Sequence, residues 1–230
     1  MRKLIALILA LALCLGLSAA FAESTVTVTG NGETLVTADT AVVSLGVSVR
    51  DTDALKAQSG ANAVIAKIRE ALAGAGFDAE DISTGYINLY AVYDYSREVE
   101  TISAYNANST LSIRVTDMGR VGEVIDLAFG AGANTLNGVS FSVADDSEAR
   151  AEALKAAVAD AKAKAAVLAE AAGFSELEII SVSEGGISSF DSGVNNFSRK
   201  AAGAEMDEAT VVRAAKICVS AGVTIVFSVK

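Results

Sequence analysis

The hydrophobic residues of this chain change their spacing repeatedly between residues 40 and 143, and this change of period limits the folds that it can adopt. In residues 40–50 every second side chain is apolar, a pattern that predicts a strand with one buried face. In residues 61–72 apolar side chains recur every three or four positions, which predicts an amphipathic helix, capped at its start by Thr52 or Asp53. The remaining predictions are strands at 82–95 and 102–115, a helix from Asp117 to about Gly130, and a strand at 139–143.

This order of elements is strand, helix, strand, strand, helix, strand, which is the βαββαβ arrangement. We therefore predict the α+β class, with helices packed on a mixed, largely antiparallel sheet. The length suits one large domain, so residues 23–230 are expected to form a single domain, with two lobes as the alternative.

A long helix and two strands are predicted after this core. The helix covers 146–172, where Asp145 and Glu148 resemble a capping box and Gly173 suits the C-terminal cap. Its alanines would allow close approach to a sheet. Its buried stripe is predicted to contain Leu154, Val158, Ala161, Ala165 and Leu168. The strands are predicted at 177–182 and 217–229.

Two segments are less regular. A short strand is predicted at 25–29, and Asn31-Gly32 after it indicates either a turn or a bulge. Residues 185–209 are rich in Gly, Ser, Asn and Ala and have no period. A stretch of this length without a pattern is usually functional or disordered, so we expect a flexible loop at about 185–209.

The first 22 residues have the features of a secretory signal peptide. Arg2 and Lys3 precede an apolar run at 4–17, and small residues follow up to an Ala-x-Ala site. The run is shorter than the roughly 20 residues that span a bilayer as a helix. We therefore expect cleavage after Ala22, export to the periplasm, cell surface or extracellular medium, and no transmembrane segment after leader removal. A retained anchor and a lipoprotein lipidated at Cys14 are the alternatives.

Composition excludes several classes of function. The chain has no histidine, which is the commonest general base and metal ligand, so we expect neither cofactor nor metal. Its formal net charge of −10 disfavours nucleic acid, whose binding depends on Lys and Arg, and disfavours anionic lipid. Beyond the leader, Cys218 is the single cysteine. It is interpreted as a packing residue in a strand, and pairing between chains is the alternative.

Several motifs resemble one family over nearly the whole exported chain. They are VTVTGNGE at 26–33, ADTA at 38–41, DIST at 81–84, the more specific GAGANTLNGVSF at 130–141, and an alanine-rich helix carrying Ala149-Arg150 and Ala161-Lys162. In these motifs the chain resembles the SIMPL-domain family of exported bacterial proteins, described as periplasmic immunogenic, outer-membrane or oxidative-stress defence proteins. One departure is Ala38, where the family usually has proline.

The resemblance implies an α+β fold, an envelope location and, for some members, ring-like or channel-like oligomers. It implies no established catalytic residues. We therefore expect no enzyme but an exported envelope protein that acts by self-assembly, as a homo-oligomer, or by binding an envelope protein or ligand.

All the tyrosines of the chain fall in the predicted hairpin at 82–115. Tyr86 and Tyr90 are expected on one strand face, Tyr93 and Tyr95 on the other, and Tyr105 on the partner strand near Tyr93. Exposed together, such side chains would form a large apolar patch, so they are the candidate interaction surface. Packing within the chain, against a helix or the long loop, is the alternative.

Carboxylates are the plentiful catalytic groups, and they support the alternative function of a carboxylate- or cation-dependent hydrolase outside the cytoplasm. The candidate clusters are Asp78, Glu80 and Asp81; Asp145 and Asp146; and Glu205, Asp207 and Glu208. They fall at predicted helix caps or in loops without calcium-loop spacing, where solvated acids are the ordinary interpretation. A serine–lysine dyad has no convincing helical context, and the glycines at 130–132 end a helix rather than open one, as a phosphate loop requires.

Overall fold

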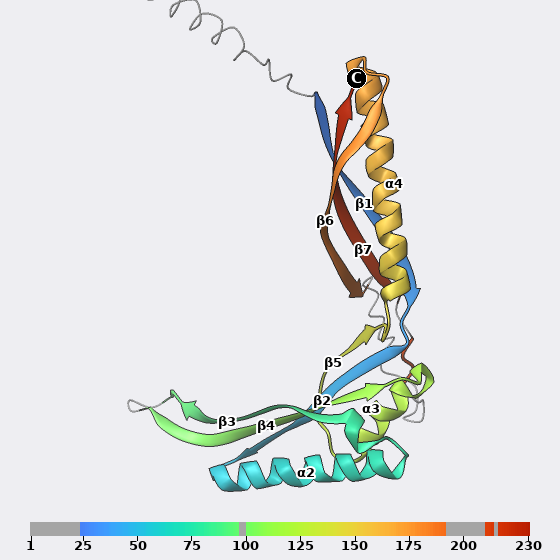
Figure 1. Cartoon of the computed structure of the whole chain (residues 1–230). Coiled ribbons are helices and arrows are strands. Elements are labelled where there is room, and N and C mark those ends of the chain that lie inside the picture. Colours follow the sequence, from blue (N-terminus) through green and yellow to red (C-terminus); the bar gives the residue numbers. More distant parts are fainter. Residues whose placement is uncertain (1–23, 97–99, 192–209, 214–215) are drawn as a thin grey trace, which may run out of the picture. The chain divides into compact units, whose positions relative to one another are not determined.

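The computed structural model describes residues 24–96, 100–191, 210–213 and 216–230 (Figure 1). Its elements are β1 (Thr25–Thr37), β2 (Thr40–Asp51), α2 (Ala54–Gly74), η1 (Ala79–Asp81), β3 (Ile82–Asp94), β4 (Thr101–Val115), η2 (Met118–Arg120), α3 (Val121–Gly130), β5 (Thr135–Ser142), α4 (Ser147–Ala172), β6 (Leu177–Asp191) and β7 (Lys216–Val229). The predicted α+β class is confirmed, and the βαββαβ order runs from β2 to β5. The signal peptide predicted at 1–22 lies outside the described residues.

The described residues form two compact units. One contains 24–32, 154–186 and 222–230, and the other contains 33–153 and the described parts of 187–221. The strand order is β1-β7-β6 in one sheet and β3-β4-β2-β5 in the other. Within the part of the chain that is described, no helix has both the length and the apolar character needed to cross a bilayer.

The four-stranded sheet of the second unit is antiparallel, with β2 between β4 and β5. Val43, Leu45 and Leu111 project from β2 and β4 on one face and are fully buried with Ile68 of α2 and Val124 of α3. Burying side chains of this size stabilises the fold by about 1.5–3 kcal/mol each. Both helices therefore cover the same face of the sheet, and the opposite face carries the other half of each strand's residues.

The cap of α2 agrees with the sequence. The Asp53 carboxylate accepts hydrogen bonds from the backbone N–H groups of Leu55 (2.8 Å) and Lys56 (3.1 Å), which have no partner inside the helix. Gly76 follows the helix with a φ of 85°, and the Phe77 N–H reaches back to the Leu72 carbonyl (3.0 Å). This geometry ends α2 where its glycines predict.

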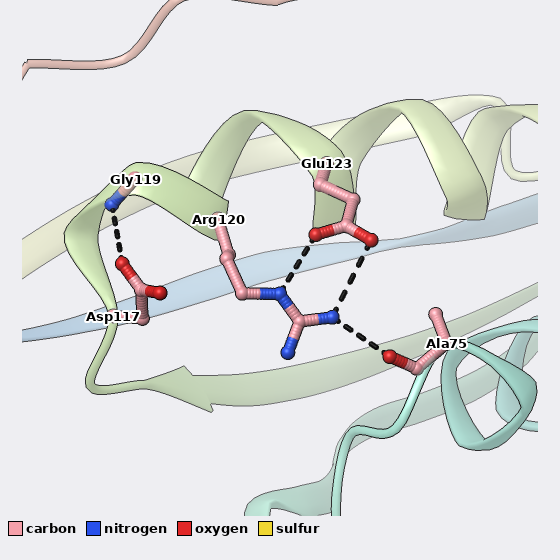
Figure 2. Close-up of polar contacts among 5 residues, drawn as sticks. All are labelled: Ala75, Asp117, Gly119, Arg120 and Glu123. Atoms are coloured by element: carbon pink, nitrogen blue, oxygen red, sulfur yellow. Dashed lines mark hydrogen bonds and ion pairs between the residues drawn. The ribbon is translucent and has the colours of Figure 1, made fainter.

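Arg120 links the start of α3 to the end of α2 (Figure 2). Its Nη2 donates to the Ala75 carbonyl (2.8 Å), and its Nε donates to Glu123 Oε2 (2.8 Å). The guanidinium also lies 4.0 Å from the centroid of the Phe77 ring. These contacts hold the two helices side by side beneath the sheet.

The helix predicted to start at Asp117 begins differently. The Asp117 carboxylate accepts from the Gly119 N–H (2.9 Å; Figure 2) and caps the short 3₁₀ turn η2, and α3 proper starts at Val121. A 3₁₀ turn at a helix start is common because it satisfies an extra backbone group.

In the first unit α4 packs closely on strands β1 and β7. Ala157, Ala161 and Ala165 are buried against Val28 and Ile225. A Cβ placed on Gly30 would lie 2.0 Å from the Ala157 carbonyl oxygen, so strand and helix backbones meet there without an intervening side chain. The expected close approach of alanines to a sheet is therefore observed.

The predicted stripe of α4 needs one correction. Leu168 is 49% exposed, whereas alanines at intervals of four residues are buried. These are Ala149, Ala153, Ala157, Ala161, Ala165 and Ala169. A close helix–sheet approach excludes the larger leucine, so the smallest side chains occupy the contact and the leucine faces outward.

The turn considered at Asn31-Gly32 is absent, because β1 continues through both residues to Thr37. A tight hairpin turn of the Asn-Gly type needs positive φ angles, and neither residue has one. The Asn31 N–H instead donates to Asp160 Oδ2 of α4 (2.8 Å). Likewise β6 extends to Asp191, so the loop expected at 185–209 begins as strand, and its larger part lies outside the described residues.

Candidate interaction surface

The β3–β4 hairpin exposes several large apolar side chains among the described residues of the second unit. It is antiparallel, with Ile82 opposite Ile113 and Asp94 opposite Thr101, and its register shifts between Thr84 and Ile87 and between Val92 and Tyr93. β3 is an edge strand, because β4 is its neighbour in the described sheet. Figure 1 shows the end of β3 and the start of β4 beyond the start of α2.

The register divides the tyrosines of the hairpin into separate sets. Tyr90 lies opposite Asn106, on the sheet face that α2 and α3 do not cover, and Tyr86 lines the same surface. The rings of Tyr93 and Tyr95 lie near the tip, with centroids 6.3 Å apart and planes tilted by 43°. The structure thus brings Tyr86 together with Tyr90, and Tyr93 together with Tyr95.

Tyr105 occupies a different environment. It lies opposite Ala91 and Asp51 and packs, partly buried, against the cluster that contains Ala107 of β4 and Ala61 of α2. Tyr93 lies opposite Ile102 instead. One of the five candidate tyrosines, Tyr105, therefore packs within the chain against a helix, as the alternative interpretation proposed.

Three aliphatic residues of the hairpin are also exposed, which the sequence pattern did not predict. Ile87, Leu89 and Ile102 have exposed fractions of 57%, 41% and 48%. Leu89 lies opposite Ala107, so it points to the helix side of the sheet although it stays exposed. In the sequence these aliphatic residues alternate with polar ones, which is also the pattern of a strand with one buried face. Together with Tyr93 and Tyr95 they are called the hairpin apolar set below.

The opposite face of the sheet holds an open groove of about 670 Å³. Ser, Thr and Asn side chains make up most of its lining, Val47 and Gly85 also contribute, and the rings of Tyr86 and Tyr90 lie on the β3 side. Asn106 is central: its Nδ2 donates to the Tyr90 hydroxyl (2.9 Å), and its Oδ1 accepts from the Ser48 hydroxyl (3.2 Å).

The GAGANTLNGVSF motif forms one side of this groove for identifiable reasons. Gly132 ends α3 with a φ of 110°, and the Asn134 side chain then pairs with the backbone of Ser48, accepting from its N–H (2.7 Å) and donating to its carbonyl (2.9 Å). Gly138 adopts a φ of 147° where the β2–β5 register shifts. That shift presents Asn137 to the groove.

The carboxylates of Asp145 and Asp146, which were considered for catalysis, form hydrogen bonds with neighbouring residues. Hydrogen bonds from Arg150 and Ser189 lower the pKa of Asp146, whose Oδ1 lies 2.6 Å from Arg150 Nε. Hydrogen bonds from Ser147 lower the pKa of Asp145. A general acid at neutral pH needs the opposite shift. The Asp145 carboxylate also accepts from the Ser147 N–H at the start of α4 (3.0 Å), as a capping group does.

The other acids offer no assembled site in the part of the chain described. Asp81 pairs with Arg114 (2.6 Å), and Glu205, Asp207 and Glu208 lie outside the described residues. Among the residues that are described, no group of three or more His, Cys, Asp or Glu side chains is placed to hold a metal ion. Cys218 is buried in β7 as a free thiol.

Fold and surface together define an α+β protein built on a βαββαβ sheet, with an apolar hairpin on one side and a polar groove on the other. The family model named SIMPL, described as a protein of unknown function (DUF541), matches residues 26–227. The chain therefore belongs to the SIMPL family.

Two kinds of relative share part of this sequence. The 26 kDa periplasmic immunogenic protein of Brucella melitensis is 31% identical over 164 residues, which is 69% of this chain and 66% of that protein, and its counterpart in Brucella abortus is 30% identical over the same length. The uncharacterized protein YggE of Escherichia coli is 28% identical over 131 residues, 57% of this chain and 53% of YggE. The match thus spans just under two thirds of the Brucella protein and about half of YggE.

Proposed function

We propose that this protein is a non-enzymatic protein of the periplasm that assembles with further copies of itself through the β3–β4 hairpin. The periplasmic location is supported by the leader predicted at 1–22 and by the names of the Brucella relatives. The absence of histidine and the lowered pKa values of Asp145 and Asp146 support a function without catalysis.

The observation that carries the assembly is the exposure of the hairpin apolar set on and beside the edge strand β3. Tyr95 and Ile87 are 76% and 57% exposed, and β3 is 13 residues long. Long edge strands with exposed apolar side chains are templates for pairing with another chain, and proteins that stay single usually protect them. Covering the set between two copies would contribute about 25 cal/mol per Å² of apolar area removed from water, which offsets part of the cost of association.

The test compares variants that keep the fold. Replacing Ile87 and Leu89 together by serine removes apolar area from the hairpin without touching the residues that α2 and α3 bury. A matched control replaces Val167 and Leu168 of α4, which are 66% and 49% exposed, by serine. We expect the parent and the α4 variant to form assemblies in solution, and the Ile87/Leu89 variant to have the mass of one chain.

Light scattering coupled to size-exclusion chromatography over a range of protein concentrations measures these masses. A parent that keeps the mass of one chain at every concentration contradicts self-assembly. An Ile87/Leu89 variant that assembles like the parent shows that another surface is used.

A further inference from the structure

We propose that the groove on the outer face of the four-stranded sheet binds an uncharged glycan chain. This site is separate from the hairpin apolar set, because Tyr90 shares the face of Asn106 whereas Leu89 shares that of Ala107. The volume of about 670 Å³ falls within the range of about 300–1,000 Å³ typical of ligand sites.

The side chains that line the groove have neutral polar groups that match those of a sugar. Ser44, Ser48, Asn106, Asn108, Thr110 and Asn137 all offer neutral hydroxyl or amide groups to the groove. Such groups both donate and accept hydrogen bonds, as sugar hydroxyls do. Phosphates or nucleic acid would require Lys or Arg.

The second argument is the lack of charge in the groove of a protein with a formal net charge of −10. Among the described residues, no charged side chain lines the groove. Arg114 lies on β4 beyond the groove and pairs with Asp81. Arg50 lies opposite Asn106 at the edge of the groove, and its Nη2 contacts the Ser103 hydroxyl (3.5 Å). The groove thus favours a neutral ligand over an ionic one.

The third argument is the position of two exposed aromatic rings along one side. Tyr86 and Tyr90 are 54% and 45% exposed and line the groove from β3. Residues four apart on a strand are separated by roughly 13 Å. Aromatic faces pack against the C–H faces of sugar rings, and this spacing suits a chain of several sugars rather than a monosaccharide.

The lining is also held in place before any ligand binds. Asn106 is fixed by Ser48, Tyr90 and Asn108, and the Thr110 hydroxyl accepts from the Tyr86 N–H (2.8 Å). Within the described residues, the Tyr90 hydroxyl hydrogen and the Asn108 amide hydrogens have no acceptor, so they remain free to donate to a sugar. Preorganised groups of this kind lose little entropy on binding.

The test titrates the protein, purified after export, with chitotetraose and cellotetraose, and with tetragalacturonate as an anionic control. Isothermal calorimetry measures affinity, and ¹H–¹⁵N chemical shifts locate the site. We expect saturable binding of at least one neutral tetrasaccharide, with shifts at Tyr90, Asn106 and Asn108, and at least tenfold weaker binding of the anionic one.

Variants connect the affinity to the groove. Tyr90→Ala and Asn106→Ala should each weaken binding at least tenfold, Tyr90→Phe should weaken it less because the ring remains, and Tyr95→Ala at the hairpin tip should change it less than twofold. Thermal unfolding checks that each variant is folded. Tyr90→Phe keeps the volume of the ring, so it remains informative if Tyr90→Ala does not fold.

Three results would overturn the proposal. They are no saturable binding of either neutral tetrasaccharide, equal binding by the parent and both alanine variants, and saccharide-induced shifts that leave Tyr90, Asn106 and Asn108 unchanged. The Ile87/Leu89 serine variant separates this proposal from self-assembly: it should bind the saccharide as the parent does, whatever its mass.

Discussion

At the residue scale, small side chains fix the closest contacts of the fold. Gly30 lies where β1 meets α4, and a Cβ there would come within 2.0 Å of the Ala157 carbonyl oxygen and 2.6 Å of the Ala161 nitrogen. Both are backbone atoms, so the helix would have to move. Next to this contact, the Asn31 N–H donates a hydrogen bond to Asp160.

We therefore predict that Gly30→Ala destabilises the protein by about 1–3 kcal/mol or more, as overpacking of a tight interior contact does. The matched control is Gly74→Ala at the end of α2, where a Cβ meets nothing within 4 Å and φ is not positive. That change should be neutral or slightly stabilising. Urea unfolding measures both variants, and equal stability of the two would refute the close contact.

At the element scale, the sequence predicted most segments because their periods are local. The alternation of β7 and the capping of α2 by Asp53 need no information beyond a few neighbours, and both are observed. The continuation of β1 through Asn31-Gly32 could not be predicted this way. It depends on Asp160, which is 129 residues away.

The candidate site was predicted only in outline, for the same reason. The hairpin and its tyrosines follow from the sequence, but the face on which each ring lies depends on two register shifts in β3 and β4. The groove forms only when four strands pair in the order β3-β4-β2-β5, and the residue pattern of each strand does not predict this order. A local pattern could not predict the contact of Thr210 either. Its N–H and hydroxyl donate to Asp126 of α3, which is 84 residues away (3.0 and 2.6 Å).

At the scale of the whole molecule, the absence of histidine determines the response to pH. Hydrogen bonds from Arg120, Arg150 and Lys164 lower the pKa values of Glu123, Asp146 and Asp160. A carboxylate whose pKa is lower in the folded state contributes stability above its unfolded pKa, and this is lost as pH falls through the folded value.

We therefore predict a constant Tm between about pH 6 and 8, where no histidine titrates, and a falling Tm below about pH 4, where the paired carboxylates become protonated. Glu123→Gln should lower the Tm at pH 7 and reduce the loss on acidification, because it removes one of these groups. Calorimetry across the pH range measures this. A step in Tm near pH 6.5 would contradict the account.

The central claim is that copies of this protein meet through the β3–β4 hairpin. Amide hydrogen exchange, followed by mass spectrometry at low and high protein concentration, tests it most directly, with the exposed side of α4 as the internal reference. The account predicts slower exchange in residues 86–94 at high concentration and unchanged exchange in α4. Exchange in β3 that is independent of concentration, while the mass of the particles rises, would contradict it.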